Sequence, residues 1–240
     1  MHKERDLHEL VKRLKEADEA NLAAVVLYGS AADQEFREEH SDLNILCLLQ
    51  QVGGAELAKL QPVGRWWWHK GHPAPLVFTL RELQESADVF TIELLDMKEH
   101  HRILWGEDFL VGLDVPMSLH RLQVERELRT SVIRLRQAFL RSRGHRGELM
   151  ELMVASASTF STLFRHSLIT LGEKPPDTRR QVSERLASRL GLNLAPFQIV
   201  LDLREGKSSA SDLNIEQVFA AYLDAVGRVA EEMDHRLATG

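Results

Sequence analysis

The sequence predicts an α+β protein with two domains, a small mixed-sheet domain at residues 1–115 and an all-α helical bundle domain at residues 116–240. Short apolar runs alternate with helical periodicity in the first half, whereas helical periodicity alone continues after Pro116. The charge changes at the same point. Residues 1–115 carry 12 Lys and Arg against 21 Asp and Glu, a net charge of −9, whereas residues 116–240 carry 18 against 15, a net charge of +3. We therefore expect two domains with different partners.

The composition excludes several classes of protein. The 240 residues are 44% hydrophobic, which is enough to bury a full core. No apolar run is long enough to cross a membrane and the first residues lack the core of a secretory signal, so we expect a cytoplasmic protein without a membrane partner. The net charge of −6 argues against a nucleic acid partner. Cys47, the single cysteine, lies in an apolar run and is expected to be buried, which excludes a disulfide within the chain and a cysteine-based zinc site.

The first domain is predicted from apolar spacing and from glycine and proline breaks. Its first helix follows from three- and four-residue spacings between Leu7, Leu10, Val11 and Leu14. Its first two strands are continuous apolar runs that end before glycines. The expected order is a helix at 5–18, a strand at 22–28, helix-compatible polar residues at 31–39, a strand at 43–49, a helix at about 55–70 and a strand at 76–80.

One segment of this domain is compatible with two structures. The apolar alternation over residues 90–97 is incomplete, and the length of the run suits either a strand or a helix. We interpret this segment as a strand.

The second domain is predicted to be all helical. Long apolar stripes at helical spacing predict helices at about 118–142 and 147–171. Asp177 or Thr178 can cap a third helix that ends at Gly191, and Asn214 with Gln217 provides a start for a last helix at about 215–237. The loop at 206–211 is expected to be short and irregular.

A short motif between the first two strands points to phosphate chemistry. The turn Gly29-Ser30 is followed after eleven residues by Asp42-Leu-Asn44-Ile. A Gly-Ser turn between a strand and a helix presents backbone N–H groups that favour a phosphate. Asp42 and Asn44 are two apart on a strand, so their side chains are expected on the same face. Paired carboxylates at such a place hold the divalent metal ions of nucleotidyl transfer.

These residues resemble the signature of the DNA polymerase beta-like nucleotidyltransferase superfamily, and the layout is similar to that of bacterial antibiotic nucleotidyltransferases and their stand-alone relatives. The resemblance implies transfer of a nucleoside monophosphate from a nucleoside triphosphate to an acceptor hydroxyl. It implies that Gly29 and Ser30 bind the nucleotide, that Asp42 binds Mg²⁺, that Asp42 and Asn44 are the catalytic pair, and that the bundle forms the far wall of a cleft. The acceptor, a small molecule or a protein, stays open, as do the base and the oligomeric state, a homo-oligomer included.

The chain departs from the family pattern at two acidic positions. Asn44 stands at the second of them and offers Mg²⁺ a neutral oxygen, although Mg²⁺ prefers carboxylates. The strand at 76–80 lacks the third acidic residue, and Glu82, Glu93 and Asp96 are candidates to replace it, although each is expected at the surface or at a helix cap. Two functions therefore stay open: an impaired nucleotidyltransferase, and a catalytically inactive nucleotide- or protein-binding module on the same fold.

Histidines and tryptophans elsewhere are interpreted structurally. The pairs His69/His72 and His100/His101 lack a recognised set of metal ligands and are expected at the surface. The triplet Trp66-Trp67-Trp68 cannot share one helix face, so we expect at least one exposed ring. Packing between the two domains is the interpretation we adopt, and stacking on a nucleotide base is the alternative.

Arginines cluster in and after the first helix of the bundle, between Arg121 and Arg146. We expect a solvated helix face whose arginines pair with Glu125, Glu127 and the acidic first domain. The alternative is that several of them line a cleft and bind a triphosphate or another anionic substrate.

Overall fold

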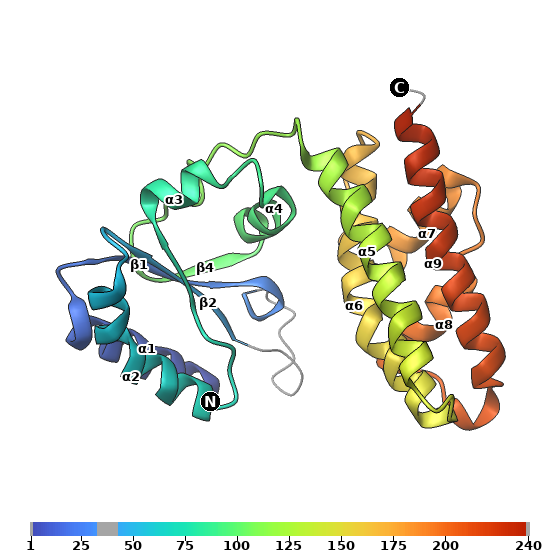
Figure 1. Ribbon diagram of the computed structural model, residues 1–240, viewed down its shortest axis with the longest axis horizontal. Coiled ribbons are helices and arrows are strands. Elements are labelled where there is room, and N and C mark those ends of the chain that lie inside the picture. The colour runs from blue at the N-terminus through green and yellow to red at the C-terminus, as the bar shows by residue number, and fades with distance from the viewer. Residues whose placement is uncertain (1, 33–42, 239–240) are drawn as a thin grey trace. The chain divides into compact units, whose positions relative to one another are not determined.

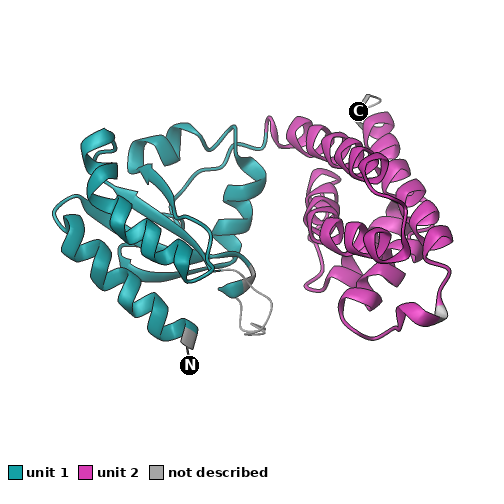
Figure 2. Cartoon of the chain, turned by 60° about the horizontal axis from the view of Figure 1, so that its bottom comes forward, with its two compact units in different colours: residues 1–117 teal, residues 118–240 magenta. Residues whose placement is uncertain are grey.

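The computed structural model describes residues 2–32 and 43–238 (Figure 1). The chain divides into two compact units, Met1–Met117 and Ser118–Gly240 (Figure 2). Each unit has its own hydrophobic interior, so each is described by itself. Within the described residues, no helix combines the length and the apolar run that a membrane span requires.

Unit 1 is built on a mixed four-stranded sheet. Its strands are β1 (Leu22–Tyr28), β2 (Asn44–Leu49), β3 (Leu76–Thr79) and β4 (His101–Gly106), in the order β3-β2-β1-β4. β1 pairs antiparallel with β2 and β4, and β2 pairs parallel with β3. A mixed sheet followed by helices confirms the α+β class that the sequence predicts.

Helices cover both faces of this sheet (Figure 1). They are α1 (His2–Asp18), α2 (Gly54–His69), α3 (Leu80–Glu85) and α4 (Thr91–Glu99). Successive side chains of β1 and β2 point to opposite faces of the sheet, so they pack in two different hydrophobic clusters. Val25 and Cys47 face the cluster that includes α1 and α2, whereas Val26 and Leu46 face the one that includes α3 and α4. Cys47 is fully buried as predicted, and burial raises the pKa of its thiol to about 12.

The interpretation of residues 90–97 as a strand is wrong, because Thr91–Glu99 forms α4. Leu94 and Met97 are three apart, so one helix face carries both of them into the core beneath α3 and α4. The fourth strand is β4 instead, which the spacing argument did not predict. β4 lies at the sheet edge and only partly buries its side chains, so it lacks the continuous buried run that marked β1 and β2.

Unit 2 consists of the helices α5 (His120–Arg141), α6 (Arg146–Thr170), α7 (Arg179–Leu190), α8 (Ala195–Arg204) and α9 (Ile215–Ala238). Four of them match predicted helices. Thr178 caps α7, and Gly191 ends it with a φ of 69°. The helix α8 was not predicted, because it is short and its buried Phe197, Val200 and Leu201 lie close together between turns.

Aromatic rings fill the interior of unit 2. Phe160 and Phe164 of α6 lie against Phe197 of α8 and Tyr222 of α9, with the rings of Phe197 and Tyr222 stacked at a centroid distance of 5.9 Å. Burial raises the pKa of the Tyr222 phenol well above its ordinary value, and the hydroxyl keeps a hydrogen-bond partner in Ser156. These contacts join three helices that are far apart in sequence.

Candidate functional site

The turn after β1 depends on glycine. Gly29 has a φ of 77° and opens the short 3₁₀ helix Gly29–Ala31, to which Ser30 belongs. A side chain is disfavoured at this φ, so glycine suits the position. The N–H of Gly29 donates to the carbonyl of His100 at 3.0 Å, which extends the pairing of β1 with β4. Gly29 therefore contributes the sharp turn, while its own N–H is bonded to the backbone.

Asn44 lies directly against this turn. It opens β2 and pairs with Tyr28, the last residue of β1. A Cβ built on Gly29 would lie 3.5 Å from Asn44 Nδ2, which is ordinary van der Waals contact. The structure thus brings together two of the site residues that the sequence predicts. Asp42 and the expected helix-compatible stretch at 31–39, from residue 33 onward, lie outside the described residues.

A pocket of about 420 Å³ opens beside Gly29 on the face of the sheet that carries α3 and α4. Tyr28 lines it, and burial raises the pKa of the Tyr28 phenol, so this group is neutral at physiological pH. Among the described residues, Glu93 and Asp96 of α4 are the charged ones that line it. Most of the remaining described wall is apolar: Leu46, Leu76, Phe78, Leu83, Phe90, Leu94 and Met97. The described residues that line the pocket all belong to unit 1.

The strand β3 explains why no carboxylate of the sheet enters this pocket. Leu76 pairs with Leu46, and both line the pocket on the face of β2 that also carries Asn44 by strand alternation. Leucine therefore lies where β3 could have presented an acidic side chain. Among residues 2–32 and 43–238, no group of three or more His, Cys, Asp or Glu side chains could hold a metal ion. Asp42, the expected metal ligand, lies outside these residues.

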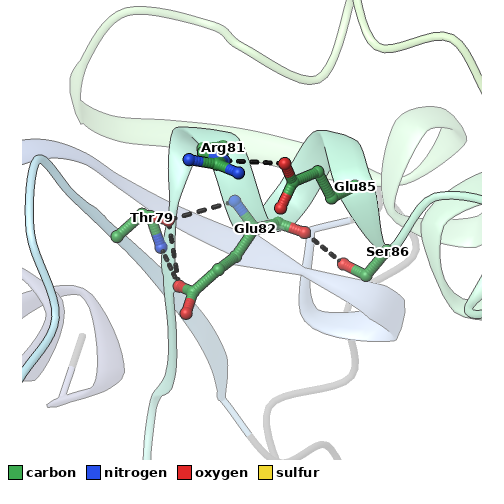
Figure 3. A network of polar contacts seen from close by, with 5 residues as sticks. All are labelled: Thr79, Arg81, Glu82, Glu85 and Ser86. Carbon is green, nitrogen blue, oxygen red and sulfur yellow. Dashed lines mark hydrogen bonds and ion pairs between the residues drawn. The ribbon is translucent and has the colours of Figure 1, made fainter.

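The candidates for a displaced carboxylate have two different roles. Glu82 is a helix cap, as expected: its carboxylate accepts from the N–H of Thr79 at 2.7 Å and from the Thr79 hydroxyl at 3.0 Å (Figure 3). In return, the Glu82 N–H donates to Thr79 Oγ1, which completes a capping box for α3. These bonds hold the pKa of Glu82 below its ordinary value. Glu93 is exposed, as expected, and Asp96 is partly buried; both line the pocket.

No family model and no curated protein matches the chain. The chain is similar in structure to an adenyltransferase. That structure, the spectinomycin adenyltransferase AAD(9) from Enterococcus faecialis with ATP and spectinomycin, is 14% identical, with a TM-score of 0.46 over 93% of this chain and 99% of that one. A mutant of the toxin–antitoxin complex MntA–HpeT is 18% identical, with a TM-score of 0.33 over 50% of this chain and 92% of the matched chain.

The tryptophan triplet divides between core and surface. Trp67 is fully buried in the core of unit 1, so the interpretation that the triplet packs between the domains is wrong for this ring. Trp66 lies under the guanidinium of Arg13, 4.5 Å from the ring centroid. Trp68 is 65% exposed, which confirms that one ring reaches the surface.

The histidines follow the expected surface placement only in part, since His100 and His101 are partly buried. His72 is buried with its ring centroid 4.3 Å from that of Trp67, whereas His69 is exposed. Unit 2 contains a buried pair that the sequence did not predict: His120 Nε2 and His166 Nδ1 lie 2.9 Å apart. These two residues are 46 positions apart on different helices, so only the packing of α5 on α6 could reveal the contact.

The arginines of α5 partly follow the expected pairing. Arg129 bonds to Glu125 at 3.0 Å and to Asp234 of α9 at 2.6 Å. Both partners raise the pKa of the Arg129 guanidinium. Arg126 and Arg134 are exposed on the same helix. These exposed arginines lie on a solvated face of unit 2. Ion pairs at such exposed positions contribute little to stability.

Proposed function

We propose that the chain is a nucleotidyltransferase-like protein that binds a nucleoside triphosphate at the Gly29–Ser30 turn. Its transfer of a nucleoside monophosphate to an acceptor hydroxyl is impaired, because Asn44 replaces the second acidic residue. The observation that carries this proposal is the position of Asn44 beside the Gly29 turn: Asn44 pairs with Tyr28 across the sheet, and Asn44 Nδ2 lies 3.5 Å from where a Cβ on Gly29 would be. It supports a shared site for the two halves of the motif.

Asp42 is the residue that we propose as the ligand of Mg²⁺, which would offset the charge of the phosphates when bound. Asn44 adds a neutral oxygen, and Leu76 adds none. Because Mg²⁺ affinity depends on the number of charged oxygen ligands, we expect weak Mg²⁺ binding.

A second candidate is a catalytically inactive module that binds a nucleotide or a protein. The observation that favours it is the pair of neutral residues, Asn44 on β2 and Leu76 on β3, on the face where transfer chemistry needs carboxylates. This candidate predicts nucleotide or partner binding without turnover.

The test combines calorimetry of nucleoside triphosphates, with and without Mg²⁺, and a transfer assay with labelled triphosphates. We expect Asp42→Ala to remove the Mg²⁺-dependent part of binding, and Asn44→Asp to raise Mg²⁺ affinity by about tenfold or more, because it restores a carboxylate. Gln61→Glu, on the exposed surface of α2, adds the same charge away from the site and serves as the control.

The outcomes separate the two candidates. Binding with slow turnover that Asn44→Asp accelerates supports the impaired transferase. Binding without turnover in either protein supports the inactive module. If Asp42→Ala changes neither binding nor turnover, the proposed site is wrong.

A further inference from the structure

The helix α5 has apolar side chains on two opposite faces. The inner face, which includes the buried Val124 and Leu128, packs in unit 2, where α5 contacts α6 and α9 (Figure 1). On the outer face, Leu122, Ile133 and Leu140 are 62%, 52% and 81% exposed. At 3.6 residues per turn, these three side chains lie within about 20° of one another around the helix axis. A line of exposed apolar residues, unlike a single one, indicates an interaction surface.

Three arginines lie on the same line. They alternate with the apolar residues so that successive members are four and three residues apart. This is the heptad spacing of a helix that packs along a second helix. We call this set the α5 seam: Leu122, Arg126, Arg129, Ile133, Arg136 and Leu140.

The positive charge of the seam is only partly balanced within the protein. Arg129 bonds to the carboxylates of Glu125 at 3.0 Å and of Asp234 at 2.6 Å. Across residues 2–32 and 43–238, no carboxylate pairs with Arg126 or Arg136, and both arginines are exposed. An occupant with acidic side chains at these two places would supply the partners that the two guanidinium groups lack.

We propose that the α5 seam docks an acidic amphipathic helix of another protein. Its apolar side chains contact the exposed apolar residues of the seam, and its Asp or Glu side chains lie against Arg126 and Arg136. Apolar burial contributes affinity, while the ion pairs determine the register and exclude basic partners. The seam belongs to unit 2 and requires neither nucleotide nor metal, so this inference goes beyond the proposed function.

Charge argues against a second copy of the chain as the occupant. The antiparallel register that sets Leu122 against Leu140 of the second copy also sets Arg126 against Arg136, and the symmetry repeats this like-charge contact. In a parallel pair, each arginine would face its own counterpart. A membrane surface is disfavoured as well, because arginines interrupt the apolar line, whereas a membrane-binding helix presents a continuous apolar face.

The experiment uses three synthetic helical peptides, each three heptads long. The acidic peptide has Leu at the seam positions that face apolar residues and Glu at those that face arginines. The basic peptide has Lys in place of every Glu, and the third peptide has Ser in place of every Leu. Fluorescence anisotropy with the full chain, without nucleotide or Mg²⁺, measures each dissociation constant. We expect the acidic peptide to bind about tenfold more tightly than either of the others.

Apolar variants test whether the binding occurs on the seam. Ile133→Ser and Leu140→Ser are each expected to weaken the acidic peptide by about five- to tenfold, because each removes a side chain that the peptide buries. Leu57→Ser makes the same kind of change on α2, at a side chain that is 44% exposed. This control should keep the affinity of the original chain.

A charge reversal tests the role of the arginines. Arg126→Glu combined with Arg136→Glu should bind the basic peptide more tightly than the acidic one, a change of preference that a loss of structure would not produce. Arg65→Glu combined with Arg179→Glu changes the net charge equally at exposed positions of α2 and α7. This second control should keep the preference for the acidic peptide.

Five results would overturn the proposal. The first three are no binding of the acidic peptide in the high micromolar range, equal affinity for the acidic and basic peptides, and equal losses in seam and control variants. The fourth is a dimer in analytical ultracentrifugation that Ile133→Ser dissociates, which would make a second copy the occupant. The fifth is binding to phosphatidylserine vesicles that Leu140→Ser abolishes, which would make a membrane the occupant.

The measurements are independent of the nucleotide site. No peptide or vesicle experiment depends on nucleotide binding, so failure here is distinguishable from failure of the proposed function. Circular dichroism on each variant confirms that it is folded.

Discussion

Gly29 and Asn44 show how much the candidate site depends on single residues. The turn needs a positive φ at Gly29, and Asn44 Nδ2 lies 3.5 Å from where a Cβ on Gly29 would be. The residue types at both positions could be predicted from the motif, but their proximity could not. It arises from the register that pairs Tyr28 with Asn44 across the sheet.

Replacing Gly29 by alanine is expected to destabilise the protein by about 1–2 kcal/mol, because a left-handed backbone is unfavourable for residues with a Cβ. The added methyl group meets Asn44 Nδ2 at 3.5 Å without a clash, so the cost comes from the backbone. Urea unfolding measures it. The control is Gly71→Ala, with a φ of 87° and open space around the position. Both variants should lose similar stability, and only Gly29→Ala should alter nucleotide binding. Equal binding in both would contradict a role for the turn in the site.

The short helix α3 illustrates how an element is determined by its cap. It spans only Leu80–Glu85 and begins at the Thr79–Glu82 capping box, while Arg81 and Glu85 form an i,i+4 ion pair along it (Figure 3). A helix this short is not stable in isolation. The capping box and the burial of Leu83 therefore stabilise α3, and Leu83 also lines the pocket.

We expect Thr79→Ala to destabilise unit 1 by about 1 kcal/mol at neutral pH, because the N-cap bonds are lost. The pKa of Glu82 should then rise toward its ordinary value of 4.5. Since the folded pKa of Glu82 is lowered, its contribution is present above the unfolded pKa and is lost as pH falls through the folded pKa. The stability difference between the two proteins should therefore shrink below pH 4.5. Carboxyl NMR titration and urea unfolding at several pH values measure both effects, and Thr130→Ala, away from any helix start in α5, is the control.

The secondary structure of residues 90–97 could not be predicted from the sequence. The apolar residues of this segment fit either a helix or an irregular strand, and local spacing does not choose between them. Packing decides, because a helix buries Leu94 and Met97 together against the same cluster as Leu83. The consequence is functional, since only the helix brings Glu93 and Asp96 to one pocket.

Each of the two units buries its own set of apolar residues. Trp67 and Phe160 are fully buried, one in each of the units Met1–Met117 and Ser118–Gly240. We propose that the units unfold as separate cooperative steps, in keeping with the domain boundary expected near residue 115.

Trp67→Ala and Phe160→Ala each remove a large buried ring, so each should cost about 3–5 kcal/mol in the unit that contains it. Differential scanning calorimetry should show two transitions, with Trp67→Ala lowering one midpoint and Phe160→Ala the other. Trp68→Ala, at a ring that is 65% exposed, should leave both midpoints nearly unchanged. A single transition that both core variants shift equally would contradict independent units.

The sequence by itself determined the α+β class, the buried strands at Leu22–Tyr28 and Asn44–Leu49, and most helices of unit 2, because periodicity and caps are local properties. It also identified Gly29, Ser30, Asp42 and Asn44 as the motif. Only the tertiary structure decided that Leu76 lies beside Leu46, that Glu82 is a cap, and that Glu93 and Asp96 line an apolar pocket. Strand register and helix packing bring together residues that are distant along the chain, and no local pattern encodes that choice.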